Sequence, residues 1–88
     1  MSAAPTNDPT ALGLRALAAT LAHQRLAERF LSLSGIEPPE LRHRASDPRV
    51  LAAVLRFLEA HEPDLVAIAE ELGVMPAELV AARHELEQ

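Results

Sequence analysis

Apolar residues recur along this chain at the three- and four-residue spacing of helices that bury one face. The spacing predicts six short helical segments separated by turns. Proline stands at or near the start of most of them, where its missing N–H costs no hydrogen bond. The expected inner faces are Leu14, Leu17, Ala18 and Leu21; Leu26, Phe30 and Leu33; Leu41 and Ala45; Val50, Leu51, Val54, Leu55, Phe57 and Leu58; Leu65, Ile68, Ala69 and Leu72; and Leu79, Ala82 and Leu86.

Caps and breakers set the expected helix boundaries. Asp8 and Asp47 are suited to cap the first and fourth helices, with Ser46 as an alternative cap for the fourth. Gly35 and Gly73 are expected to end the second and fifth helices in the left-handed conformation. The remaining signals are Pro9, Pro38, Pro48, Pro63 and Pro76 as helix starts, and His23-Gln24 as an end or bend between the first two helices.

The expected fold class is all-α, a compact orthogonal bundle of five or six short helices. Residues 49–59 are apolar over a wide arc and should therefore lie at the centre. Residues 1–7 are expected to form a flexible N-terminal arm, and residues 8–88 a single helical domain. The expected core consists of Leu17, Leu21, Leu26, Phe30, Leu41, Val54, Leu55, Leu58, Ile68, Leu72, Leu79 and Leu86.

The last two helices have the spacing of a helix-turn-helix. Ala69, Gly73 and Leu79 fall where that motif has a small residue, a turn glycine and an apolar anchor. The segment after the turn, Met75-Pro76-Ala77-Glu78, offers no side chain that makes the bidentate base contacts of Arg, Asn or Gln. Two interpretations remain: a degenerate DNA-binding motif, or two short helices that pack across a tight turn.

Composition and charge narrow the choice. The chain has 88 residues and no cysteine, which excludes a disulfide, a thiolate metal site and a thiol nucleophile. The formal net charge of −5 is the sum of −7 on residues 58–88, which have one Arg and eight acids, and +2 on residues 1–57. Such an acidic half repels the phosphates of duplex DNA. We find no signal peptide and no apolar run of ~18 residues, so we expect a soluble cytoplasmic protein with no membrane contact.

Three arginines form the candidate docking surface for a protein partner. Arg42, Arg44 and Arg49 lie close together in sequence, around the expected third helix and the turn after it. Guanidinium groups pair with carboxylates in a bidentate way, so the cluster could receive an acidic partner or a phosphate. The alternative is a solvated face that is partly neutralised by Glu37, Glu40 and Asp47, or by the acidic C-terminal half folding back on it.

Catalytic, cofactor and metal sites are not expected. The four histidines are far apart in sequence, and none pairs with another at helical spacing. The polar cluster of Glu59, His61, Glu62 and Asp64 is most simply a capping turn. No serine has the surroundings of a nucleophile elbow, and no glycine-rich loop could hold a phosphate. The histidines are His23, His43, His61 and His84, the serines are Ser32, Ser34 and Ser46, and the isolated glycines are Gly13, Gly35 and Gly73.

The chain resembles a bacterial family of small all-helical proteins, domain of unknown function 3572, over about residues 11–86. The similarity is carried by Arg29-Phe30-Leu31, Ser34-Gly35, Leu41-Arg42, Ala45, the run from Leu51 to Leu58, and Glu62. Most of these are packing residues, so the resemblance implies a fold and no activity. The family often has a Trp in the first helix, where this chain has Ala18-Ala19-Thr20, and an acid where this chain has Arg56.

The expected function is that of a non-catalytic protein–protein interaction module that is a monomer or a weak homodimer. The alternative is a degenerate helix-turn-helix domain that binds nucleic acid or assists transcription. A small enzyme or enzyme subunit comes third, and a buried polar pocket would favour it. An exposed apolar groove would favour the first function, and a basic surface patch would favour the second.

Overall fold

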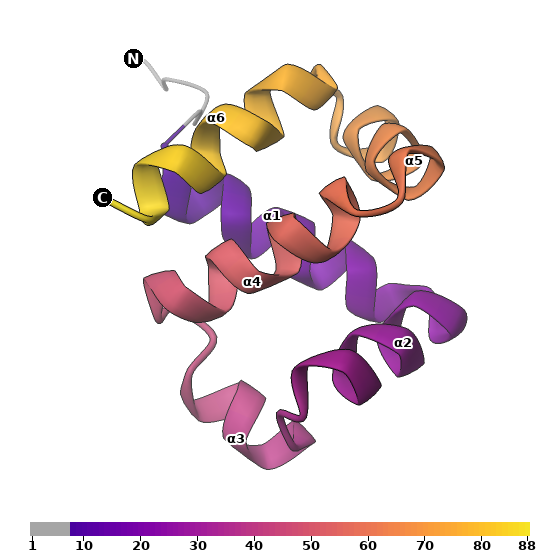
Figure 1. The fold of residues 1–88 in the computed structure, drawn as a ribbon, viewed down its shortest axis with the longest axis vertical. Coiled ribbons are helices and arrows are strands. Elements are labelled where there is room, and N and C mark those ends of the chain that lie inside the picture. The colour runs from indigo at the N-terminus through magenta and orange to yellow at the C-terminus, as the bar shows by residue number, and fades with distance from the viewer. Residues whose placement is uncertain (1–7) are drawn as a thin grey trace.

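Six α-helices make up the fold in the computed structural model, which describes residues 8–88 (Figure 1). They are α1 (Pro9–Ala22), α2 (Gln24–Ser34), α3 (Pro38–His43), α4 (Pro48–Glu59), α5 (Glu62–Leu72) and α6 (Pro76–Leu86). These residues contain no strand, so the all-α prediction is confirmed. The predicted arm, residues 1–7, lies outside the described residues. Within residues 8–88 no helix combines the length and the apolar character that crossing a bilayer requires.

The helix boundaries follow the predicted caps. The Ala11 N–H donates to Oδ2 of Asp8 at 2.9 Å, which caps α1. His23 separates α1 from α2 with extended backbone at φ −100° and ψ 111°. Gly35 and Gly73 each have φ 72°, a left-handed conformation that glycine adopts without steric cost. The cap of α4 is Asp47 rather than Ser46.

Helix α4 lies in the middle of the molecule, as residues 49–59 predicted. It packs against α1, α2, α5 and α6, and Figure 1 shows it in front of α1 with α6 on one side and α2 and α3 on the other. Its buried residues are Val50, Leu51, Ala52, Val54, Leu55, Phe57 and Leu58. A helix with so wide an apolar arc must be covered on several sides, which explains its central position.

The inner face of α1 differs from the prediction. Leu14 and Leu21 are each 37% exposed, and Ala18 is exposed as well. The helix is rotated because it approaches α4 through Gly13, where an added Cβ would lie 3.1 Å from Cβ of Leu51. The buried residues of α1 are Leu12, Gly13, Ala16, Leu17 and Thr20. Gly13 therefore faces α4, while Leu14, Ala18 and Leu21 of the predicted stripe turn towards solvent.

The other helices bury most of the predicted residues. The prediction of Leu33 on the inner face of α2 is wrong, because its side chain is 73% exposed. Leu72 and Leu86 are partly buried at the edge of the core. The predicted core residues that are buried are Leu17, Leu26, Phe30, Leu41, Val54, Leu55, Leu58, Ile68 and Leu79.

Ion pairs join the last helix to the central one. Nε of Arg83 donates to Glu59 at 2.5 Å, and Nε of Arg56 donates to Glu87 at 2.5 Å. Arg83 also donates to Glu87 at 2.8 Å. The hydrogen bond that Arg83 donates to Glu59 raises the pKa of Arg83, and the hydrogen bond that Arg56 donates to Glu87 lowers the pKa of Glu87. Both shifts show that these charged forms are stabilised across the α4–α6 contact.

Candidate functional site

The three candidate arginines lie around α3 and the turn that joins it to α4. Arg42 is in the last turn of α3, Arg44 is its C-cap, and Arg49 is in the first turn of α4. Leu41 is buried and anchors this short helix on the core. The Asp47 N–H donates to the carbonyl of Arg44 at 2.9 Å, which keeps the turn tight. The arginines are thus held on a compact corner of the fold.

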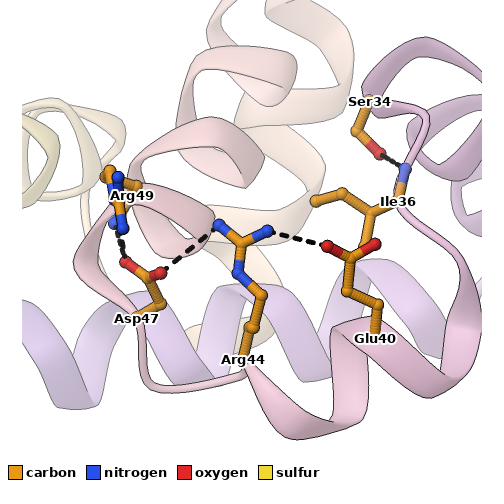
Figure 2. Close-up of polar contacts among 6 residues, drawn as sticks. All are labelled: Ser34, Ile36, Glu40, Arg44, Asp47 and Arg49. Atoms are coloured by element: carbon orange, nitrogen blue, oxygen red, sulfur yellow. Dashed lines mark hydrogen bonds and ion pairs between the residues drawn. The ribbon is translucent and has the colours of Figure 1, made fainter.

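Arg44 bridges two acidic residues within this corner. Its Nη1 donates to Glu40 at 3.0 Å and its Nη2 donates to Asp47 at 3.3 Å. Figure 2 shows the guanidinium group between the two carboxylates. Both hydrogen bonds raise the pKa of Arg44, and the one to Glu40 contributes most. The charge of Arg44 is therefore largely compensated inside the chain.

Asp47 also engages Arg49. Oδ1 of Asp47 accepts the backbone N–H of Arg49 at 2.9 Å, and Nε of Arg49 lies 3.5 Å from the same oxygen (Figure 2). The hydrogen bond from the Arg49 N–H is the main cause that lowers the pKa of Asp47 below its ordinary value of 3.8. The side chain of Arg49 is 85% exposed, so it remains accessible to solvent beyond this contact.

Arg42 lies apart from this network. No ion pair or side-chain hydrogen bond between residues 8–88 involves it. It stands instead at a groove of about 270 Å³ between α1, α2 and α3. The groove is lined by Leu17, Leu21, Leu31, Pro38, Leu41, Arg42 and Ala45. The structure therefore brings Arg44 and Arg49 together at Asp47 and places Arg42 beside an aliphatic groove.

A second groove of about 310 Å³ runs between α2 and α4. The two phenylalanines of the chain, Phe30 and Phe57, meet here edge to face with ring centroids 5.5 Å apart. The guanidinium carbon of Arg29 lies 5.4 Å from the ring centre of Phe57, which is within cation–π range. The lining consists of Arg29, Phe30, Leu33, Ser34, Ala53, Arg56, Phe57 and Ala60.

The sequence interpretation missed this second groove because it placed Leu33 on the inner face of the second helix. Helix α2 ends at Ser34, and Gly35 turns the chain away towards α3. At this end of α2 Phe30 and Leu31 face the core, whereas the rest of residues 8–88 leave the side chain of Leu33 exposed. The available signal was local: Leu33 stands between Ser32 and Ser34, immediately before a helix stop.

The polar cluster before α5 is structural. Asp64 is buried and accepts hydrogen bonds from Nδ1 of His61 at 2.9 Å and from Nη1 of Arg29 at 3.3 Å. It thereby ties α2 to the first turn of α5, whereas Glu59 pairs with Arg83. Among the described residues no group of three or more His, Asp or Glu is placed to hold a metal ion.

Helices α5 and α6 pack across the turn that the helix-turn-helix spacing predicts. Ala69 and Leu79 are buried, and Gly73 makes the left-handed turn. The Met75 N–H donates to the carboxylate of Glu78 at 2.8 Å, which fixes the start of α6. Each of the three residues that resemble the motif thus has a packing or turn role here.

Comparison with known proteins identifies a family. The model of the family described as "Protein of unknown function (DUF3572)" matches residues 6–88. No curated protein and no solved structure matches the chain significantly. The match covers nearly the whole chain, so it extends the resemblance at Leu51–Leu58 and its neighbours to the entire helical bundle. The chain therefore belongs to the DUF3572 family of proteins of unknown function.

Proposed function

We propose that this chain is a non-catalytic module that binds another protein through the surface bearing Arg42, Arg44 and Arg49. The observation that carries the proposal is the aliphatic groove with Arg42 at its edge. An exposed apolar groove beside a charge that no acid among residues 8–88 pairs with has the composition of a docking site for a short peptide segment.

The groove favours a segment with an aliphatic side chain and a nearby carboxylate. Its lining is aliphatic except for Arg42, and Leu21 is the partly exposed wall on α1. An apolar side chain inserted here would release water both from its own surface and from the groove. Burial of this kind supplies most of the binding free energy at such anchors. A carboxylate of the partner would pair with Arg42 and fix the direction of the segment.

Arg44 and Arg49 would act at longer range. Asp47 and Glu40 already hold the guanidinium of Arg44, and Asp47 contacts Arg49. Rim arginines of this kind mainly raise the association rate and make it depend on salt. We therefore assign the anchor to Arg42 and its groove, and steering to the exposed Arg49.

The proposal includes no reaction and no cofactor. We place the chain in the cytoplasm, where a small module of this kind would meet its protein partner. Genomic neighbours would supply the first candidates for that partner.

The test compares Arg42→Glu with Arg25→Glu. Arg25 is exposed at the start of α2, outside the groove, and makes no ion pair with residues 8–88. Proteins retained by the wild-type chain are identified by mass spectrometry, purified and titrated against each variant by calorimetry. Arg42→Glu should weaken binding of the true partner by about tenfold or more, while Arg25→Glu should stay within about twofold.

A third variant tests the apolar part of the same site. Leu21→Glu places a charge in the groove and should also abolish binding without unfolding the chain, because Leu21 is partly exposed. A partner that binds wild type, Arg42→Glu and Leu21→Glu with equal affinity contradicts this site. Replacing all three arginines by alanine is less informative, because Arg44 holds the α3–α4 turn.

A further inference from the structure

The exposed face of α5 is acidic with an apolar centre. Glu62, Val66 and Glu70 follow one another at four-residue spacing, so they lie along one line of the helix. All three are exposed, and Val66 is 45% exposed. Neither Glu62 nor Glu70 forms an ion pair with residues 8–88. Glu62 and Glu70 therefore give this face a negative charge that no cation among residues 8–88 pairs with, whereas Asp64 and Glu71 on the same helix are paired with Arg29 and His23.

The groove between α2 and α4 has the opposite character. Leu33 projects from its wall, Phe57 lies in its lining, and Arg29 and Arg56 flank it. The only side-chain hydrogen bond of Arg56 to residues 8–88 uses Nε, so both Nη groups remain available. Arg29 uses Nη1 towards Asp64 and is 44% exposed. Both arginines can therefore donate hydrogen bonds to a further carboxylate on the side that faces solvent.

We propose that two copies of this chain associate by seating the α5 face of one copy on the α2–α4 groove of the other. Val66 contacts Leu33 and Phe57, while Glu62 and Glu70 lie eight residues, or about 12 Å, apart along α5 and pair with the two arginines at the groove. This proposal is independent of the partner site at Arg42.

The occupant is a second copy because charge and apolar pattern complement each other on the same chain. The acidic face is on the half that carries −7, and the groove is built from the half that carries +2 together with Ala60. The two surfaces are neighbours, since Arg29 of the groove bonds Asp64 at the start of α5. With a twofold axis between the copies, the α5 face of each copy would dock on the α2–α4 groove of the other. The contact would then form twice, and the assembly would close as a dimer.

The association should be weak and salt-sensitive. The groove is short and the ion pairs lie at its rim, so the dissociation constant should be on the order of 100 µM. Sedimentation equilibrium from about 10 µM to about 1 mM would measure it. A dimer fraction that rises with concentration at ~50 mM salt and falls at ~500 mM salt supports the proposal. A chain that stays monomeric throughout at the lower salt overturns it.

Charge reversal identifies the surfaces. Arg56→Glu and Glu70→Arg should each weaken self-association by about tenfold, because each sets like charges opposite one another. An equimolar mixture of the two variants should recover association, since each supplies the charge that the other lacks. Arg25→Glu is the matched control and should dimerise as the wild type does. A dimer that both reversals leave unchanged overturns the proposed surfaces.

An uncharged pair of variants protects the test against misfolding. Arg56 also pairs with Glu87, so Arg56→Glu could disturb the α4–α6 contact. Leu33→Ser and Val66→Ser remove exposed apolar side chains and should leave the circular dichroism spectrum and melting temperature near those of the wild type. Both should shift the chain towards monomer. If both fold and dimerise normally, the groove is not the interface.

Discussion

Asp47 shows how much one side chain does at the α3–α4 corner. It caps α4 by accepting the N–H of Arg49, and its other oxygen accepts from Arg44. These contacts favour the ionised form and lower the pKa of Asp47 from its ordinary value of 3.8. A group with a lowered folded-state pKa stabilises the fold above its ordinary pKa, and this contribution is lost as the pH falls through the folded-state pKa.

Replacing Asp47 with Asn should therefore have a pH-dependent effect. Asn keeps the capping oxygen and removes the charge, so Asp47→Asn should lower the melting temperature at neutral pH. The difference from wild type should be complete above about pH 5 and shrink as the pH falls below the ordinary carboxyl pKa. Thermal melts from neutral to acid pH measure it, with Glu85→Gln as an exposed control. A difference that stays constant down to acid pH contradicts the assignment.

Gly13 is a second residue at which the packing around it decides how much a substitution costs in stability. A valine at this position would press against Cβ of Leu51, which is fixed to the backbone of α4 and cannot rotate away. Gly13→Val should lower the free energy of unfolding by about 1–3 kcal/mol through overpacking. Ala18→Val, on the exposed side of α1, should cost only a helix-propensity difference of about 0.5 kcal/mol. Urea denaturation separates the two, and equal losses would mean that α1 and α4 are not in close contact.

At the scale of whole helices, local signals predicted boundaries better than rotation. Proline starts, the caps and the glycine stops act within a turn or two, so they are readable from the sequence. The side of α1 that is buried could not be read from the sequence, because alanine and leucine occur on several of its sides. The close approach at Gly13 decides which side faces the core. The cover over Leu33 likewise depends on where α3 leads the chain.

The central position of α4 carries a prediction about stability. Leu55 is fully buried in α4, so Leu55→Ala should lower the free energy of unfolding by about 2–5 kcal/mol. The whole chain is expected to have roughly 4–13 kcal/mol, so much of the population would unfold at body temperature. Ala81→Ser, on the exposed side of α6, should change little. Indistinguishable melting temperatures for the two variants would contradict the central packing of α4.

For the molecule as a whole, the charged contacts of the candidate site could be predicted from the sequence, whereas its two apolar grooves could not. The engagement of Arg44 by Glu40 follows from their four-residue spacing on a helix. The groove beside Arg42 is built by α1, α2 and α3 together, and the groove at Leu33 is built by α2 and α4 together. No local pattern encodes how separate helices come together, which is why the arginines of the candidate site could be predicted from the sequence and its apolar surfaces could not.

The overall charge predicts that the chain does not bind duplex DNA. Residues 58–88 carry the net charge of −7, and α6 opens with Met75, Pro76, Ala77 and Glu78. Phosphate contacts are strongest at low salt, so fluorescence anisotropy on random duplex at ~50 mM salt is the sensitive measurement. The anisotropy should stay flat up to high protein concentration. Micromolar binding to the duplex that weakens as salt is added would contradict this prediction and favour the helix-turn-helix interpretation.

The position of α6 links folding to the order of synthesis. Helix α6 follows all the others in the chain, yet it packs against α1 and α4, which leave the ribosome earlier. Until Leu79 and Ala82 arrive, the apolar sides of α1 and α4 that they cover stay open to water and to other nascent chains. The bundle can therefore close only after translation has passed Leu86, and a chain stalled before that point presents the kind of surface that chaperones bind.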